Sequence, residues 1–332
     1  MSHTPLRIGV LGAAAIVPTA LTGPARSVPE VEVAAIAARD PKRAAAFARR
    51  HHIPRVHPTY ADVVADPEID AIYNPLPNSL HAEWTIRALR AGKHVLCEKP
   101  LASNAVEAEE MGGVAAETGL VLSEAFAYRY HPLAARMKEI LGSGEIGEVR
   151  HIHAELRFLL PLTNNIRFKY ELAGGSLMDN GCYPVSLIRF LAEAEPEVVS
   201  ARAALFDAQV DHAMQADLAF ADGRTAHMAS SLLSPYLFRS FVRVRGDAGV
   251  LTVINPHHPH FFNWLSVRGR RGRRSGYVRG GNVYAFQLRA FVRAIRGEGT
   301  LSTGPADAIA NMRVIDAIYE KAGLQRRGVK AV

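Results

Sequence analysis

Long hydrophobic runs are missing from this sequence of 332 residues. No stretch approaches the roughly 18 consecutive apolar residues that a transmembrane helix needs, so we expect no membrane partner. The hydrophobic fraction of 48% and the charged fraction of 21% are typical of a globular protein with an ordinary core. The start, Met1 to Pro5, leads directly into a predicted strand and leaves no room for a signal peptide. We therefore expect a cytoplasmic protein.

Cysteine is also scarce, with only Cys97 and Cys182 present. Two cysteines form neither a disulfide framework nor a zinc ligand set. Three histidines, His257, His258 and His260, lie among prolines, but no cysteine or carboxylate cluster completes a metal site with them. We expect no metal.

Acidic residues are outnumbered by basic ones, which gives a formal net charge of +7. Such an excess can indicate nucleic acid or an anionic ligand. No helix-turn-helix, zinc-finger or aromatic RNA-binding pattern accompanies it, so we expect no nucleic-acid partner. Much of the excess lies between Arg268 and Arg274. We interpret this run as a solvated loop; a phosphate contact or a subunit contact is the alternative.

Strands and helices alternate in the first third of the chain. The predicted strands are 8–11, 31–37, 69–73, 95–97 and 120–122, and the predicted helices are 16–25, 41–50, 79–91 and 104–118. Asn78 is a plausible N-cap for the third helix, and Gly92 is its stop. Alternation of this kind predicts an α/β fold with a parallel, doubly wound sheet.

The pattern changes after residue 124. Alternating polar and apolar residues predict strands at 149–158, 198–206, 213–220, 224–232, 240–245 and 249–254, with helices at 133–141, 176–191, 285–295 and 306–322. A period of two indicates an antiparallel or mixed sheet with one covered face. We therefore predict a dinucleotide-binding domain at 1–124 and a substrate-binding and oligomerisation domain at 125–332. The uncovered sheet face predicts a homodimer or a homotetramer.

A glycine turn follows the first strand. Gly12 holds the first position of the dinucleotide pattern, but Ala14 and Val17 stand at the second and third. Such a turn brings backbone amides and a helix N-terminus against a pyrophosphate. Ala15 and Ile16 complete the expected cofactor contacts. An ordinary strand-to-helix connection in the core is the alternative.

The second strand ends without the carboxylate that usually binds the ribose of NAD. Ala38 occupies that position, and Arg39, Lys42 and Arg43 follow. Guanidinium groups suit a 2′-phosphate, which favours NADP over NAD. A solvated helix start capped by Asp40 is the other interpretation.

The loop after the third strand contains two prolines and is stiff enough to wall a cofactor. Its expected contacts are Asn74, Leu76 and Asn78. A simple rigid connection is the alternative. His81 follows, either as a contact to the nicotinamide end or as a histidine on the helix surface.

Lys99 follows the strand at 95–97, where the carboxyl ends of parallel strands form a ligand-binding crevice. Oxidation of an alcohol needs a base for the hydroxyl proton, and Tyr183 is suited to this role if a nearby ammonium favours its phenolate. Asp179 lies four residues before Tyr183, which places both on one side of a helix. Asp179 is predicted to order Lys99. Surface positions for the lysine and the aspartate are the alternative.

Several of these segments together resemble the glucose–fructose oxidoreductase/inositol dehydrogenase (Gfo/Idh/MocA) family. They are the strand–glycine start, the stretch 74–78 with His81, 91–100 with Glu98-Lys99-Pro100, 128–132, 174–183, and 317–319 with 322–324. The resemblance implies a Rossmann domain and a C-terminal α/β domain whose open sheet serves oligomerisation. It also implies that Lys99 binds the substrate and the nicotinamide ribose, with Glu98 beside it among the cofactor contacts.

Many members carry histidine at the position of Tyr183. A tyrosine at this position resembles the dimeric dihydrodiol dehydrogenase and sugar dehydrogenase branch. In that branch the tyrosine is the acid/base, and NADP is the common cofactor. Two residues, Ala127 and Asn180, depart from the usual pattern and put a named substrate in doubt. Arg129 and Arg167 are further candidates for substrate contact.

The sequence thus predicts an NADP-preferring oxidoreductase for a polyhydroxylated small molecule, such as a sugar, a cyclic polyol or a dihydrodiol. The alternatives are an NAD-linked dehydrogenase and a non-catalytic dinucleotide-binding sensor. The set of Lys99, Asp179 and Tyr183 argues against the sensor.

Overall fold

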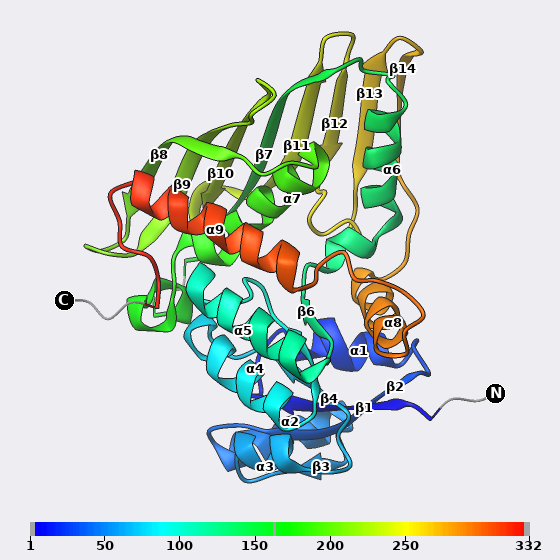
Figure 1. Cartoon of the computed structure of the whole chain (residues 1–332), viewed down its shortest axis with the longest axis vertical. Helices are drawn as coiled ribbons and strands as arrows, with labels where there is room; N and C mark the ends of the chain where they lie inside the picture. The colour runs from blue at the N-terminus through cyan, green and yellow to red at the C-terminus, as the bar shows by residue number, and fades with distance from the viewer. Residues whose placement is uncertain (1–3, 162–163, 329–332) are drawn as a thin grey trace. The chain divides into compact units, whose positions relative to one another are not determined.

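The computed structural model describes residues 4–161 and 164–328 (Figure 1). The chain divides into two compact units. Unit 1 runs to Ala102 and adds Val106–Ala127 and Tyr284–Ile309; unit 2 comprises Ser103–Ala105, Tyr128–Val283 and the chain from Ala310 onward. The predicted boundary at residue 124 lies near the point where the chain leaves unit 1. The chain returns to unit 1 for residues 284–309, a segment that the sequence placed in the second domain.

Unit 1 contains a six-stranded sheet in the order β3-β2-β1-β4-β5-β6. Its strands are β1 (Leu6–Leu11), β2 (Val31–Ala37), β3 (Arg55–Val56), β4 (Ala71–Asn74), β5 (His94–Cys97) and β6 (Leu122–Glu124). All neighbours pair in parallel. Val10, Ile36 and Ile72 have no exposed surface, as expected for a parallel sheet covered on both faces. The predicted doubly wound sheet is confirmed, and its strand order reverses between β1 and β4.

The helices of this part follow the predicted alternation with local departures. They are α1 (Gly23–Ala25), α2 (Pro41–His51), α3 (Tyr60–Ala65), α4 (His81–Arg90), α5 (Ala105–Thr118) and α8 (Val283–Ile295). Asp40 caps α2 by accepting a hydrogen bond from the Lys42 amide at 2.9 Å. The segment predicted as one helix at 16–25 begins instead with a π-helical turn, Pro18–Thr22. α3 was not predicted, although Thr59 and Asp62 form its capping box.

Unit 2 contains an eight-stranded sheet in the order β14-β13-β12-β11-β7-β10-β9-β8. Its strands are β7 (Val149–Leu159), β8 (Glu197–Leu205), β9 (Asp211–Ala219), β10 (Thr225–Ser231), β11 (Leu233–Gly246), β12 (Val250–Ile254), β13 (Trp264–Gly269) and β14 (Gly272–Gly276). Among the described strand pairs of this sheet, only β10–β7 is parallel. The predicted large, mostly antiparallel sheet is confirmed.

One face of this sheet is covered. α7 (Cys182–Ala192) packs on β7 and β10. The two helices not yet named are α6 (Pro132–Gly142) and α9 (Pro305–Lys321). Val242, Val244 and Val253 are fully buried, whereas the alternate residues of the same strands are exposed or half-buried. Within the described chain, no helix is long and apolar enough to cross a bilayer.

The interpretation of Arg268 to Arg274 as a solvated loop is wrong. These residues form the ends of β13 and β14 and the tight turn between them. Leu265 and Val267 are buried on one side of β13, and Ser266 and Arg268 lie on the other. The high arginine content hid the alternating pattern of this strand, although its buried side carries apolar residues as in other strands.

A buried ion pair joins the C-terminal segment to the start of the Leu177–Gly181 turn. Asp211 accepts from Arg327 Nη2 at 2.9 Å, from Tyr319 Oη at 3.0 Å and from the Leu177 amide at 2.7 Å. Neither charged side chain has any exposed surface. Burial raises the pKa of Asp211 to about 6, and the guanidinium opposes that rise. Arg327 also donates to the Gly174 carbonyl at 2.8 Å, so one cation holds three chain segments.

We expect Arg327→Met to lower the free energy of unfolding by about 3–5 kcal/mol near pH 8, because Asp211 then becomes a buried charge without its cation. The loss should be smaller near pH 5. The raised pKa of about 6 leaves the carboxyl of the folded chain mostly protonated there, so less charge needs compensation. Denaturant unfolding curves at both pH values measure the difference.

Arg326→Met is the matched control, since its guanidinium is partly exposed and lies 3.9 Å from Asp316. A comparable loss in this control, or a loss in Arg327→Met that does not depend on pH, would contradict the role given to the buried pair.

Candidate active site

The glycine turn after β1 requires glycine at its first position. Gly12 has a φ of +98°, and its amide donates to the Ala37 carbonyl at 2.7 Å. A Cβ at Gly12 would lie 3.2 Å from Leu76 Cδ2, which is tighter than an ordinary contact. Ala14 and Ile16 are half-buried and Ala15 is exposed. The turn therefore presents backbone to a ligand at the carboxyl end of β1, with little side chain in the way.

The end of β2 contributes cations and no available carboxylate. Ala38 is buried, Arg39 is exposed, and Arg43 donates from Nη2 to the Ala13 carbonyl at 2.8 Å. The carboxylate of Asp40 caps α2 through the amide hydrogen bond described above. The structure thus brings Arg43 to the glycine turn, as a site for a phosphorylated ribose requires. These residues fit NADP better than NAD.

The loop after β4 is held by buried polar contacts. Asn74 donates to the His81 carbonyl at 3.3 Å and to Thr85 Oγ1 at 3.2 Å, and its own oxygen faces the Leu76 amide at 3.4 Å. His81 has no exposed surface, so its interpretation as a histidine on the helix surface is wrong. Its ring nitrogens face the carbonyls of Pro100 at 2.9 Å and Leu76 at 2.8 Å. Burial lowers the pKa of His81, and its contacts with these two carbonyls oppose that shift. A neutral ring carries one N–H and can donate to only one of them.

Lys99 follows β5, as predicted, and is half-buried. Glu98 beside it accepts a hydrogen bond from Tyr73 Oη at 2.6 Å, and the Glu98 amide donates to the Asn74 carbonyl at 3.0 Å. Burial, reinforced by the Glu98 charge, raises the pKa of Tyr73 well above its usual value, so this phenol stays protonated. Tyr73 was not predicted as a site residue. It secures the carboxylate next to Lys99, and Asn78 lies in the short helical turn before α4.

In unit 2, Asp179 and Tyr183 come from a helix that changes its geometry. Leu177–Gly181 is a π-helical turn, and α7 begins at Cys182. The sequence predicted one regular helix over 176–191. π-Helical turns often occur at functional sites because the extra residue changes which side chains face the same way.

Arg167 is brought to the same place. Its Nε lies 2.8 Å from Asp179 Oδ1, and the Asp179 side chain is only 16% exposed. The charge of Asp179 is the main cause that raises the pKa of Arg167, and Tyr183 adds to it. Arg167, Asp179 and Tyr183 therefore form one electrostatic group. The sequence analysis named all three residues. It paired Asp179 with Lys99, however, and did not predict the ion pair between Asp179 and Arg167.

Aromatic rings surround Tyr183. Ring centroids lie 6.2 Å away for Tyr128, 5.7 Å for His257 and 5.5 Å for His258. The His257 ring is fully buried, with Nδ1 2.9 Å from Ser240 Oγ, and burial lowers its pKa well below the usual range. His257 therefore forms a neutral wall beside the phenol. The sequence weighed these histidines only as metal ligands, and their position next to Tyr183 depends on the long loop between β12 and β13.

Two other predicted residues have structural partners. The Arg129 guanidinium lies 4.2 Å from the Phe190 ring and 3.5 Å from Ser186 Oγ, both on α7. Asn180 is buried and donates to the carbonyls of Leu156 at 2.8 Å and Ser231 at 3.0 Å. Its polar side chain thus joins the π-helical turn to β7 and β10, which explains an amide in this core position.

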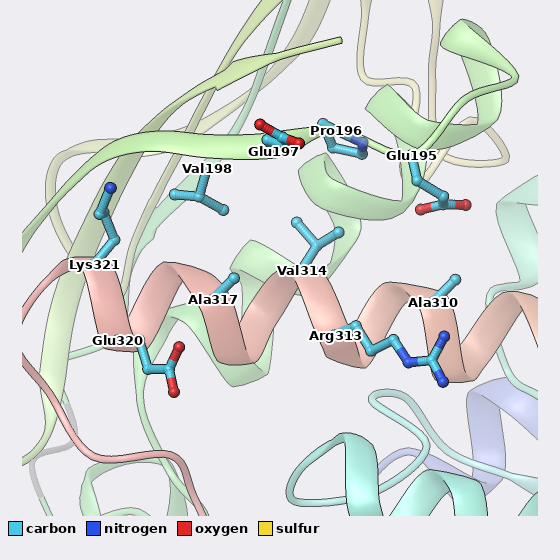
Figure 2. A pocket seen from close by; sticks show the side chains of 10 residues that line it. All are labelled: Glu195, Pro196, Glu197, Val198, Ala310, Arg313, Val314, Ala317, Glu320 and Lys321. Carbon is cyan, nitrogen blue, oxygen red and sulfur yellow. The ribbon is translucent and has the colours of Figure 1, made fainter. Parts of the chain in front are cut away.

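A cleft of about 620 Å³ lies between α9 and β8 (Figure 2). Ala310, Val314 and Ala317 line its helix side, and Pro196 and Val198 face them from the strand side. Figure 2 shows acidic and basic side chains around it without a converging set. None of the predicted site residues lines this cleft, so it is separate from the chemistry described above.

Comparison with known proteins covers both units. A sequence model described as an oxidoreductase family with an NAD-binding Rossmann fold matches residues 6–126, and that of the Gfo/Idh/MocA C-terminal domain matches residues 134–252. D-xylose 1-dehydrogenase (NADP(+)) 2 of Haloferax volcanii is 36% identical over 96% of this chain and 97% of its own. A dTDP-3,4-didehydro-2,6-dideoxy-alpha-D-glucose 3-reductase of Saccharopolyspora spinosa is 35% identical over 97% of this chain and 98% of its own.

A solved structure is similar in fold over the same length. The crystal structure of a 3-ketoreductase from Actinomadura kijaniata, in complex with NADP and TDP-benzene, has a TM-score of 0.89 at 30% identity, over 96% of this chain and 98% of that chain. The resemblance that the motifs indicated is confirmed. The chain belongs to the Gfo/Idh/MocA family of oxidoreductases.

Proposed function

We propose that this protein is an NADP-preferring oxidoreductase that transfers hydride between nicotinamide and a carbinol or carbonyl carbon of a sugar, cyclic polyol or dihydrodiol. The observation that supports it most is the grouping of Tyr183 with the ion pair of Arg167 and Asp179. A phenol beside a fixed cation is suited to proton transfer at a hydroxyl oxygen. Its cytoplasmic location remains a prediction.

The cofactor would be held by unit 1. Backbone amides of the turn at Gly12 would meet the pyrophosphate, and Arg39 and Arg43 would meet the 2′-phosphate. Asn74, Leu76 and Asn78, with His81 behind them, would wall the nicotinamide half, and Glu98 and Lys99 would contact its ribose. When bound, the nicotinamide supplies or accepts the hydride.

Tyr183 would move the proton. In oxidation its phenolate oxygen accepts the hydroxyl proton of the substrate, and in reduction its phenol returns a proton to the carbonyl oxygen. Arg167 favours the phenolate because its positive charge is permanent, and Asp179 holds that guanidinium in place. We assign Lys99 to orienting the substrate hydroxyl and to lowering the pKa of Tyr183 further. Arg129 stays a prediction as a substrate contact.

The relatives support the proposed substrate class. D-xylose 1-dehydrogenase (NADP(+)) 2 and the dTDP-keto-sugar 3-reductase are both named for chemistry at a carbon that interconverts between alcohol and carbonyl. Both align with nearly the whole of this chain. Their shared chemistry supports a sugar-like substrate and leaves the individual sugar open to assay.

Cofactor preference tests the unit 1 assignment. We expect NADP to bind roughly tenfold or more tightly than NAD, since a charge-assisted hydrogen bond contributes about 1.5–3 kcal/mol. Arg39→Ala should weaken NADP binding by a similar factor and leave NAD binding unchanged. Fluorescence titration measures both cofactors. Arg49→Ala is the control, because it removes an exposed arginine from the far end of α2. Equal affinities of the unchanged protein for NADP and NAD would refute the assignment.

Tyr183→Phe tests the acid/base role. The change keeps the ring and removes the hydroxyl, so turnover should fall by roughly 10²–10⁴-fold while cofactor affinity stays the same. Tyr236→Phe, on an exposed tyrosine of β11, controls for loss of a phenol in general. Steady-state rates over a panel of sugars and polyols give the measurement. A variant that keeps more than about a tenth of its turnover is incompatible with general acid–base catalysis by Tyr183.

The cations are tested by pH profiles. Lys99→Met and Arg167→Met should each reduce turnover and raise the apparent basic pKa of what remains, because each removes a charge that favours phenolate. Combined with Tyr183→Phe, the losses should be far from additive, since the residues act as one unit. Additive losses with unshifted profiles would instead assign the two cations to folding or to substrate binding alone.

Oligomeric state tests the open sheet face. Ile254, Trp264 and Tyr277 are each about half exposed, and Ile254 and Trp264 lie opposite each other in the register. We expect two copies to cover this apolar group around a two-fold axis, giving a dimer or a tetramer built from two dimers. Light scattering should show at least twice the chain mass of 36.1 kDa. Trp264→Glu should dissociate the assembly and Val106→Glu, at an exposed position in α5, should not; a monomer at micromolar concentration ends the proposal.

A further inference from the structure

Three histidines lie together on the open face of the eight-stranded sheet: His151 and His153 on β7, and His227 on β10. The ring centroids of His153 and His227 are 5.0 Å apart, and His151 Nδ1 lies 2.8 Å from Thr225 Oγ1. All three are half-buried, whereas Ile152, between the first two, is fully buried on the covered side. We call these three residues the histidine cluster.

The histidine cluster shares its face with the apolar group that we expect a second copy to cover. Glu155, two residues after His153, lies opposite Phe241, which lies opposite Ile254, which in turn lies opposite Trp264. Directly opposed residues point to the same face of a sheet. Two strand spacings, about 10 Å, separate β7 from β12, and β7 is one of the two central strands (Figure 1). A second copy that covers Ile254 and Trp264 therefore covers the histidine cluster as well.

Charge is distributed unevenly across this face. On the side of β8, β9 and β10, the register places Glu197, Arg202 and Asp217 on the open face beside His227. On the side of β11 to β14 it places five arginines there: Arg239, Arg243, Arg245, Arg268 and Arg273. A two-fold axis parallel to the strands, between β11 and β7, lays β8 and β9 of one copy over β13 and β14 of the other. Carboxylates then meet arginines, so charge favours this packing.

His153 faces a carboxylate that already has two cations. Its Nε2 lies 2.9 Å from Glu155 Oε1. The other oxygen of Glu155 lies 3.1 Å from Arg157 Nε and 3.0 Å from Arg239 Nε. A proton on His153 therefore adds positive charge that this one carboxylate cannot balance.

His151 has cationic neighbours and no carboxylate among its described hydrogen-bond and ion-pair partners. Arg245 lies directly opposite it on β11. Partial burial lowers the pKa of His151, and the positive charges of His153 and Arg245 add to that shift. His227 differs, because its Nδ1 lies 2.7 Å from Asp217 Oδ1, which supplies a counter-charge for its proton. The two histidines of β7 are thus the members of the cluster whose protonation leaves an excess of positive charge.

We propose that protonation of His151 and His153 separates the copies, so that the assembly through the open face is stable at neutral and basic pH and dissociates in mild acid. In the packing described above, β7 of one copy lies over β11 of the other, and the two histidines approach the other copy's Arg243 and Arg245. Like charges at that contact repel one another, and loss of water from a covered imidazole disfavours its charged form.

Both effects have the same sign. The assembled form binds fewer protons than the separate chains, so falling pH favours separation through the interval in which imidazoles titrate. The switch depends on the assembly proposed above and not on hydride transfer, because every residue in it lies on the open face of unit 2's sheet.

Light scattering at about pH 8 and about pH 5.5, at constant ionic strength, tests the proposal. We expect at least twice the chain mass of 36.1 kDa at the higher pH and the mass of one chain at the lower. The Kd of the assembly should rise about tenfold per pH unit for each proton that separation takes up. Circular dichroism should be the same at both pH values, because the chains separate without unfolding.

The variants separate the histidines from other titrating groups. His151→Gln/His153→Gln should stay assembled at both pH values, since neither replacement titrates. His151→Lys should raise the Kd at about pH 8 by about tenfold or more, because a permanent cation then faces the arginines, whereas His151→Met, of similar length and without charge, should not. The control is His52→Asn, at an exposed histidine that ends α2 in unit 1 with a φ of +59°; it should dissociate in acid like the unchanged protein.

Asp211, whose pKa is raised to about 6 by burial, titrates in the same interval and is present in every variant. A double glutamine variant that dissociates in acid like the unchanged protein would therefore assign the effect to another group and overturn the proposal. Three further results would also overturn it: a single chain at about pH 8, an assembly that persists at about pH 5.5, or separation accompanied by loss of the circular dichroism signal. Turnover is not the readout, so failure here leaves the proposed oxidoreductase function standing.

Discussion

Parallel pairing of β1 with β2 on one side and β4 on the other is the constraint on which unit 1 depends. It puts the carboxyl ends of these strands at one edge, and the reversal of strand order leaves that edge open to a ligand. Four of the predicted cofactor residues lie at this edge. Gly12 directly follows β1, Ala38 directly follows β2, Asn74 ends β4, and Lys99 follows β5. The sheet places all four residues at the same edge, so no further long-range contact is needed to bring them together.

Unit 2 positions its site residues in another way, because Asp179 and Tyr183 lie on a helical segment and not at strand ends. The segment is fixed at its start by Asp211, which bonds the Leu177 amide, and at its middle by Asn180, which bonds backbone on two strands. Both anchors are buried and polar, so each loses its water on folding and is stabilised only by complete partnering. Arg327 supplies the remaining partner from the C-terminal segment. The position of Tyr183 is therefore set by buried groups that are not among the predicted catalytic residues.

Local signals explain which features the sequence predicted well. β2 and α2 were placed almost to the residue, because a buried apolar run ends at Asp40-Pro41, a strong helix start. β13 and β14 were missed, because arginines occupy their open side and only Leu265 and Val267 carry the strand pattern. The π-helical turn at Leu177–Gly181 and the burial of His81 both depend on tertiary partners, which no local pattern records. The pair of Arg167 with Asp179 was missed for the same reason, since Arg167 comes from an irregular segment.

Two ionisable neighbours of Tyr183 keep one protonation state near neutral pH. The guanidinium of Arg167 stays protonated at any physiological pH, and Asp179 raises its pKa further. His257, the nearest ionisable ring with a strongly shifted pKa, is held neutral by burial. Neither of these two neighbours changes its charge near neutral pH. A phenol beside a permanent cation and a neutral ring is suited to act as the single acid/base residue.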